Sequence, residues 1–182
     1  FNVVPDMVLV GKALTSGYVP GGALVVGTER VESLREGFGN FTHGYTFSHH
    51  AVVAAACAEV LSIVEREGLV EKAAARGRRL KDSLQALWRF PFVGDIRGVG
   101  LLIGIELVQD RQSKAPFPRS RKLVEEIVLR AFGHGLLVYP STGCADGTDG
   151  DLILLAPPYV IEDNEIEELV SLLSQTFAEI RM

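Results

Sequence analysis

The chain has 182 residues and a formal net charge of −5, with 47% hydrophobic and 23% charged residues. This composition predicts a globular chain, long enough for one domain or two small ones, and argues against intrinsic disorder. The acidic balance also argues against a nucleic-acid partner, because binding to phosphates requires a basic face.

The chain carries no sign of a membrane span or of a disulfide framework. No apolar run reaches the roughly 18 residues that a spanning helix needs, so no membrane partner is expected. Two cysteines, Cys57 and Cys144, are too few for a disulfide framework and indicate a reducing, cytoplasmic compartment. Because the chain starts without Met and without the features of a signal peptide, we expect it to begin inside a larger protein.

The first elements are short apolar runs separated by a loop rich in Gly, Ser and Pro. We expect two buried strands at 7–10 and 23–26, on either side of a loop at 15–22. A short helix should follow at 29–36, with Thr28 as its cap.

A long apolar segment and an amphipathic one come next. Residues 49–67 are rich in Ala, Val and Leu without Gly or Pro, which predicts a mostly buried helix. Thr46 and Ser48 are candidate N-caps of this helix, and Gly68 is its candidate C-cap. Residues 69–88 carry apolar side chains at helical spacing and predict an amphipathic helix.

Strands and helices alternate in the rest of the chain. The expected strands lie at 100–108, 136–139 and 152–155, and the expected helices at 123–132 and 163–180. This alternation predicts an α/β architecture whose last part is a small α+β unit.

The common nucleotide and metal motifs do not fit. Gly11-Lys12-Ala13 lacks the earlier Gly and the following Ser or Thr of a phosphate-binding loop. The glycines after Arg97 do not match the spacing of a dinucleotide-binding loop. Asp146, Asp149 and Asp151 do not have the spacing of a calcium loop, so turn chemistry is the favoured interpretation and no metal is expected.

Lys12 is the one residue whose position calls for a chemical explanation. It directly follows an apolar strand, where a buried ammonium would be costly. Extension of the side chain to solvent is one explanation. The other is a desolvated lysine with a lowered pKa, whose free amine attacks an aldehyde.

Four segments resemble class III aminotransferases, which are pyridoxal-phosphate enzymes of fold type I in the aspartate aminotransferase superfamily. The segments occur in the order of the family and span essentially the whole chain: 5–23 around Lys12, 43–50 around Thr46, 97–106, and 155–158. The resemblance implies that 1–67 is the C-terminal end of the large cofactor-binding domain, with a mixed or parallel sheet and the long interdomain helix. Residues 68–182 would then form the small C-terminal α+β domain.

The resemblance also implies the roles of two residues. Lys12 would hold pyridoxal 5'-phosphate as a Schiff base and, once freed by the amine substrate, would transfer a proton as general base and acid. Thr46 would donate its hydroxyl to the cofactor phosphate, where the following helix N-terminus also favours an anion. A simple helix cap is the alternative role for Thr46. In the family this threonine reaches the cofactor of the neighbouring subunit, which implies a homodimer with shared active sites.

The implied reaction is transamination, from an amine or amino acid donor to a 2-oxo acid or aldehyde acceptor. Related racemases and aminomutases share the cofactor, and a non-catalytic dimerising fragment is a third possibility. The other cofactor contacts of the family precede the lysine segment, so this chain is expected to be a fragment that binds the cofactor poorly by itself. Arg97 is expected to stabilise a turn rather than to bind substrate, and Gly21-Gly22 has no account at this stage.

Overall fold

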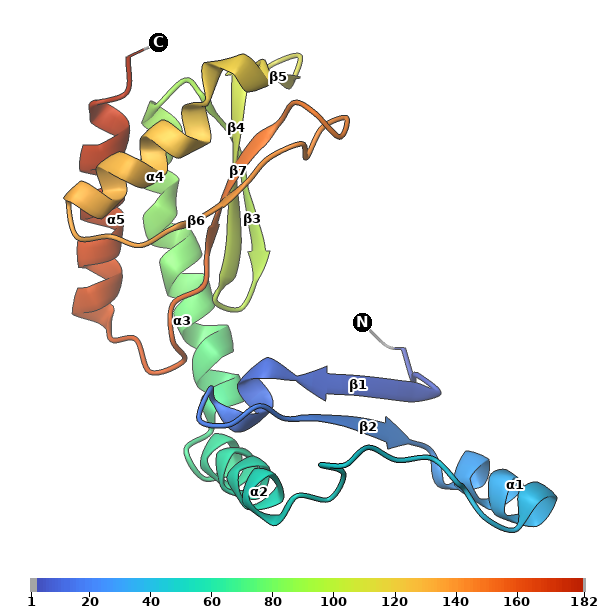
Figure 1. Ribbon diagram of the computed structural model, residues 1–182. Helices are drawn as coiled ribbons and strands as arrows, with labels where there is room; N and C mark the ends of the chain where they lie inside the picture. Colours follow the sequence, from blue (N-terminus) through green and yellow to red (C-terminus); the bar gives the residue numbers. More distant parts are fainter. Residues whose placement is uncertain (1–2, 182) are drawn as a thin grey trace. The chain divides into compact units, whose positions relative to one another are not determined.

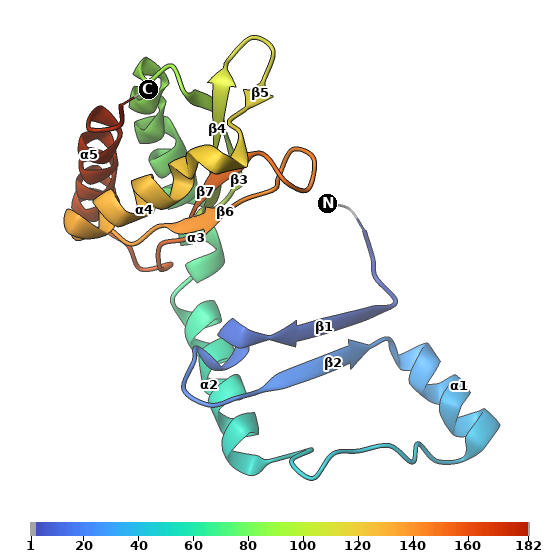
Figure 2. The ribbon, with the colours of Figure 1, turned by 45° about the horizontal axis from the view of Figure 1, so that its top comes forward.

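A computed structural model describes residues 3–181 and divides the chain into two compact units, Phe1–Gly68 and Leu69–Met182. The boundary between the two units falls after Gly68, whereas the domain boundary expected from the sequence lies after Glu67. Figures 1 and 2 show the order of the elements along the chain. Each unit is described by itself below.

The first unit contains a two-stranded ribbon and two helices. Strand β1 (Met7–Gly11) leads through the short 3-10 helix η1 (Lys12–Thr15) to strand β2 (Gly22–Val26). The strands are antiparallel, with a register that runs from Met7↔Val26 to Gly11↔Gly22. Helices α1 (Thr28–Phe38) and α2 (Ala51–Arg66) follow, so each element expected from the sequence of this unit is present.

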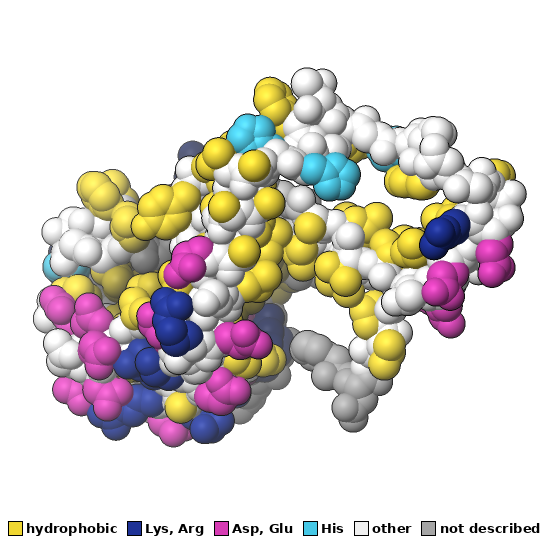
Figure 3. Space-filling model, turned by 90° about the horizontal axis from the view of Figure 1, so that it is seen from below, with side chains coloured by type: hydrophobic (Ala, Val, Ile, Leu, Met, Phe, Trp, Pro, Cys, Tyr) yellow, Lys and Arg dark blue, Asp and Glu magenta, His cyan; other side chains and the backbone are white. Residues whose placement is uncertain are grey.

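The expected burial of this unit is wrong for the described chain. Leu9 of β1 is 84% exposed, Leu24 of β2 is 55% exposed, and α2 contains no buried residue. The physical reason is that nothing within the unit forms a second layer over the ribbon or around α2. The buried residue of this unit, among those described, is Thr15. Hydrophobic side chains therefore lie uncovered on the face seen in Figure 3.

The expected N-caps of the first unit are also wrong. Thr28 is the first residue of α1 rather than its cap, and Gly27 stands at the cap position. Helix α2 is preceded by His50, which makes no side-chain cap bond, so neither Thr46 nor Ser48 caps it. The residues between Tyr45 and Ser48 form a separate turn, in which the Ser48 N–H donates to the Tyr45 carbonyl at 2.9 Å. Gly68 lies one residue past the C-cap, with a φ of 59° that suits glycine.

The second unit is an antiparallel sheet with helices on one face, as Figure 1 shows. Its sheet has the order β3-β4-β7-β6, with β5 paired to β4. The strands are β3 (Val93–Val99), β4 (Leu102–Asp110), β5 (Ala115–Pro116), β6 (Tyr139–Ser141) and β7 (Asp151–Leu155). The helices are α3 (Leu69–Ser83), η2 (Leu84–Arg89), η3 (Arg119–Arg121), α4 (Leu123–Gly133) and α5 (Asp163–Ala178).

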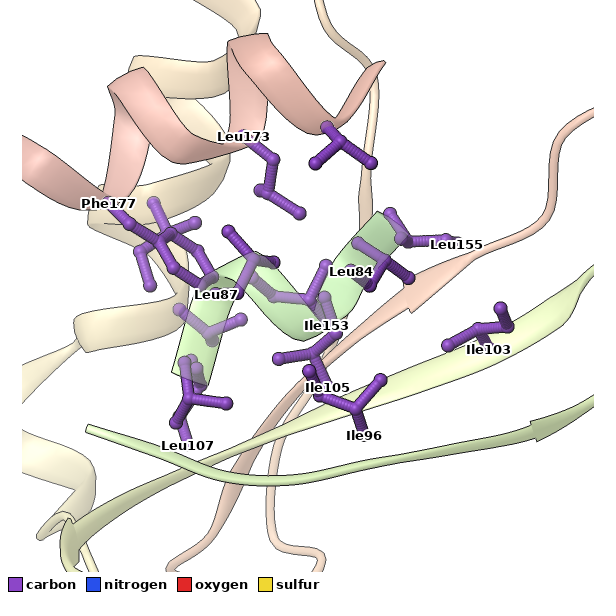
Figure 4. Close-up of a cluster of buried hydrophobic side chains, with 14 of the residues drawn as sticks. Leu84, Leu87, Ile96, Ile103, Ile105, Leu107, Ile153, Leu155, Leu173 and Phe177 are labelled. Atoms are coloured by element: carbon purple, nitrogen blue, oxygen red, sulfur yellow. The ribbon is translucent and has the colours of Figure 1, made fainter. Parts of the chain in front are cut away.

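The core of this unit lies between the sheet and the helices. Figure 4 shows side chains from η2, β3, β4, β7 and α5 pointing toward one another. Phe177 of α5 is 1% exposed and meets Phe90 and Phe92 at ring-centroid distances of 5.5 and 5.1 Å. Side chains in such a layer gain from the removal of apolar surface from water and from close packing.

Several elements of this unit differ from those expected. The helix expected at 69–88 is α-helical only to Ser83 and continues as the 3-10 helix η2. Strand β3 was missed because Gly94 and Gly98 interrupt its apolar pattern. The strand expected at 100–108 begins at Leu102, because Gly100, with a φ of 56°, belongs to the hairpin turn. The strand expected at 136–139 pairs only from Tyr139 to Ser141. Pro140 is tolerated there because β6 is an edge strand of the sheet.

Candidate functional site

Lys12 stands where β1 passes into a tight turn. It is the first residue of η1, it has a φ of 50°, and its side chain is exposed. The amine forms no hydrogen bond or ion pair with any residue between 3 and 181. Exposure is shared by the whole ribbon around Lys12, so it reflects the uncovered unit and is not a property of this side chain alone.

The turn after Lys12 is held by Thr15, whose side chain is buried. The Thr15 hydroxyl lies 2.6 Å from the Val19 carbonyl and 3.4 Å from the Lys12 carbonyl. Because one hydroxyl joins both ends of the loop, the backbone that carries Lys12 is fixed from within the turn.

Gly21 lets this turn pack against α2. A Cβ at Gly21 would lie 2.8 Å from Thr15 Cγ2 and 2.8 Å from Val53 Cγ1 of the helix. A Cβ at Gly22 would lie 3.2 Å from the Val10 carbonyl of the paired strand. These close approaches explain the Gly21-Gly22 pair, for which the sequence offered no account. No local pattern in the sequence marks this role of Gly21, because it depends on the tertiary contact between η1 and α2.

Thr46 lies in the turn that precedes α2. Its side chain is exposed, and its hydroxyl forms no hydrogen bond with the described residues. The neighbouring Ser48 hydroxyl accepts the Tyr45 N–H at 2.9 Å and so stabilises the turn in place of Thr46. The Thr46 hydroxyl is therefore available for another partner, while the first amides of α2 receive no side-chain cap. Lys12 and Thr46 do not bond to one another within residues 3–181.

Arg97 belongs to an ion-pair cluster on the sheet of the second unit. Its guanidinium donates to Asp95 at 2.9 Å and to Glu106 on the adjacent strand. The hydrogen bond to Glu106 contributes most to raising the pKa of Arg97 above its ordinary value. Burial opposes the ionisation of Asp95, but the Arg97 hydrogen bond and the Ile96 N–H outweigh it and lower the pKa of Asp95. Arg97 thus joins β3 to β4, a structural role different from the turn that the sequence predicted.

The Asp-rich loop of the second unit is built by turn hydrogen bonds. The Asp146 carboxylate accepts the N–H groups of Thr148 and Asp149 at 2.8 and 2.7 Å. In the part of the chain that the structure describes, no group of three His, Cys, Asp or Glu side chains could hold a metal ion. None of the described helices has the length and hydropathy needed to cross a bilayer.

Comparison with known proteins places the whole chain in one family. Residues 1–177 match the family model of the class III aminotransferases. The uncharacterized aminotransferase YodT of Bacillus subtilis is 39% identical over 181 residues, which cover 99% of this chain and 41% of that protein. The chloroplastic gamma aminobutyrate transaminase 3 of Solanum lycopersicum is 35% identical over 173 residues, with coverages of 93% and 32%.

Solved structures agree with these relatives. A transaminase from the marine bacterium Virgibacillus superposes with a TM-score of 0.90 at 32% identity, over 98% of this chain and 40% of that one. An amine transaminase from an uncultivated Pseudomonas species, in its PLP-bound form, gives a TM-score of 0.86 at 34% identity, with coverages of 97% and 39%. The chain therefore spans 32% to 41% of the length of these relatives. These matches show that the chain belongs to the class III aminotransferases, a family that depends on pyridoxal phosphate.

Proposed function

We propose that this chain provides the cofactor lysine, Lys12, of an enzyme that moves an amino group from an amine or amino acid to a 2-oxo acid or aldehyde. The observation that carries the proposal is the position of Lys12, an amine without a partner in the described chain, on a turn that the Thr15 hydroxyl fixes. The family match over residues 1–177 supports the same reaction.

The residues present fit pyridoxal phosphate. When bound, the cofactor supplies an aldehyde carbon that condenses with amines and a ring that accepts electrons. Lys12 Nζ is free to hold that carbon. The Thr46 hydroxyl does not cap α2, so it can donate to a phosphate oxygen. The uncapped helix N-terminus that follows Thr46 in sequence also favours an anion.

Lys12 has two tasks in this proposal. Its Nζ would hold the cofactor and would be displaced by the amine of the substrate. Once released, the amine of Lys12 would accept a proton as general base and give it back as general acid. The hydrogen bonds of Thr15 hold the backbone of Lys12, so the point from which its side chain extends is fixed.

The proposed enzyme is a homodimer with shared active sites, in which Thr46 binds the cofactor phosphate of the neighbouring subunit. The surroundings of Thr46 support this arrangement. Tyr45 and Phe47, on either side of it, are 77% and 78% exposed. Aromatic side chains gathered on a surface are typical of protein contacts.

The test replaces Lys12 in the full-length protein. Lys12→Ala should abolish the absorption band of the lysine-bound cofactor and lower the rate of amino transfer by at least about 10²-fold, because the same amine holds the cofactor and moves the proton. The measurements are the absorption spectrum with added pyridoxal phosphate and the formation of an oxo product from an amine donor.

A matched control is Lys72→Ala, which removes an exposed lysine on α3 and should leave both readouts unchanged. A band that survives in Lys12→Ala would contradict the proposal. The product also separates the related reactions: amino transfer yields an oxo product, whereas a racemase or aminomutase returns the amino group to the same substrate.

A further inference from the structure

Asp151 is a buried carboxylate in the second unit that the proposed reaction does not use. It is the first residue of β7, where the orange loop of Figure 2 enters the sheet, and it is 3% exposed. It pairs with Leu107 of β4, so its backbone is part of the sheet. An aspartate this deeply buried requires partners for both of its oxygens.

Only one of the two oxygens has a partner within residues 3–181. Asp151 Oδ2 accepts the N–H of Val124, in the first turn of α4, at 3.1 Å. The residue at the N-cap of that helix, Lys122, has a φ of 51° and makes no side-chain cap bond. Asp151 therefore caps α4 from another element. Its second oxygen, Oδ1, is buried without any hydrogen-bond partner.

The charges around Asp151 do not neutralise it. Arg119 of η3 is the cation that faces it, but the Arg119 guanidinium donates to Glu125 of α4. The backbone N–H of Arg119 donates to the Asp149 carboxylate at 2.8 Å. Glu125 and Asp149 are themselves negative neighbours of Asp151, and Leu107 on the adjacent strand is apolar. Burial is the main cause that raises the pKa of Asp151, against the opposing effects of the Val124 N–H and Arg119.

We propose that Asp151 is a proton-operated latch, which takes up a proton on Oδ1 in the folded protein and in this neutral form fastens the first turn of α4 to the start of β7. The neutral form keeps the Val124 hydrogen bond on Oδ2. It also removes the buried negative charge, so that the oxygen without a partner belongs to a neutral group. An ionised Asp151 would retain the same bond at the cost of a desolvated charge beside two other carboxylates.

The latch makes the second unit more stable as the pH falls. A carboxyl group whose folded pKa lies above its unfolded value binds its proton more tightly in the folded state. Its contribution is therefore fully present below the ordinary pKa of 3.8 and is lost as the pH rises through the raised folded pKa. Glu125, Glu126 and Asp146, whose pKa values are lowered, act in the opposite direction: their contribution is present above their ordinary pKa values of 4.5, 4.5 and 3.8 and is lost as the pH falls toward the folded values. The comparison with Asp151→Asn removes this shared effect.

The experiment compares the pH dependence of unfolding in the full chain and two variants. Trp88 is the single tryptophan and lies in the second unit, so its fluorescence in denaturant reports the unfolding of that unit. As the pH is lowered from 6 to 4, the unfolding constant of the unchanged chain should fall relative to that of Asp151→Asn. The fall should be at most about tenfold for each pH unit. Asp146→Asn is the matched control, because its carboxylate lies in the loop before β7 but is exposed, and one of its oxygens accepts the N–H groups of Thr148 and Asp149. It should keep the slope of the unchanged chain.

Equal slopes for the unchanged chain and Asp151→Asn would overturn the proposal. If Asp151→Asn does not fold, the carboxyl carbon of Asp151 is followed in the unchanged chain by NMR. A midpoint above 3.8 supports the latch, and a midpoint at or below 3.8 overturns it.

Discussion

The two units of this chain contain similar apolar segments, but only the second unit buries them. Helix α2 is made of Ala, Val, Leu and Ile over most of its length and has no buried residue. In the second unit, β7 alternates buried and half-buried positions, and α5 buries five residues along one face. The difference lies in the neighbours of each segment and not in its composition.

The comparison shows what an apolar pattern can establish. Spacing predicted most of the strands and helices in both units, because backbone conformation follows largely from local preferences. Burial requires a second layer, and the second unit supplies its own with helices on a sheet. The first unit supplies no second layer of its own. The chain spans 41% of the length of its Bacillus subtilis relative.

The largest expected effect is at the centre of the second core. Phe177→Ala should lower the free energy of unfolding of that unit by about 3–5 kcal/mol, because it removes a fully buried ring and leaves a cavity. Leu9→Ala in β1, where the side chain is 84% exposed, should change stability by less than about 0.5 kcal/mol. Trp88 fluorescence measures the first change, and hydrogen exchange of the β1–β2 amides measures the second. Similar losses at both sites would show that the first unit has a core of its own.

An intermediate effect of opposite sign is expected at two helical glycines. A Cβ at Gly77 of α3 would overlap the backbone of Gly100, so Gly77→Ala should destabilise the second unit by about 1–3 kcal/mol. Gly37 in α1 has open space around the same position, so Gly37→Ala should stabilise that helix by up to about 1 kcal/mol. Denaturant unfolding and hydrogen exchange of α1 report the two changes. A stabilising Gly77→Ala would mean that α3 does not approach the β3–β4 turn this closely.

The smallest expected effect concerns helix caps. The Glu165 carboxylate accepts the Glu162 N–H at 2.7 Å at the start of α5, so Glu165→Ala should cost about 0.5–1 kcal/mol. Thr28→Ala at the start of α1 should change little, since Thr28 makes no cap bond. Thermal unfolding compares Glu165→Ala with the unchanged chain, and exchange of the α1 amides does the same for Thr28→Ala. A larger loss of stability of α1 in Thr28→Ala would show that Thr28 caps this helix, as the sequence predicted.

The sequence alone determined the order of most elements, the family resemblance and the choice of Lys12 and Thr46. These depend on local patterns and on motifs read in order along the chain. It missed β3, because glycines break the strand pattern of Val93–Val99 and only the pairing with β4 defines that strand.

Tertiary structure decided everything that depends on contacts between distant residues. Gly21 is explained by Val53 of α2, and Asp151 by the N–H of Val124. The uncovered surface of α2 was equally invisible in its composition. Local preferences set the conformation of a segment, but burial, capping from a distance and the cost of a charge depend on which other segments lie beside it.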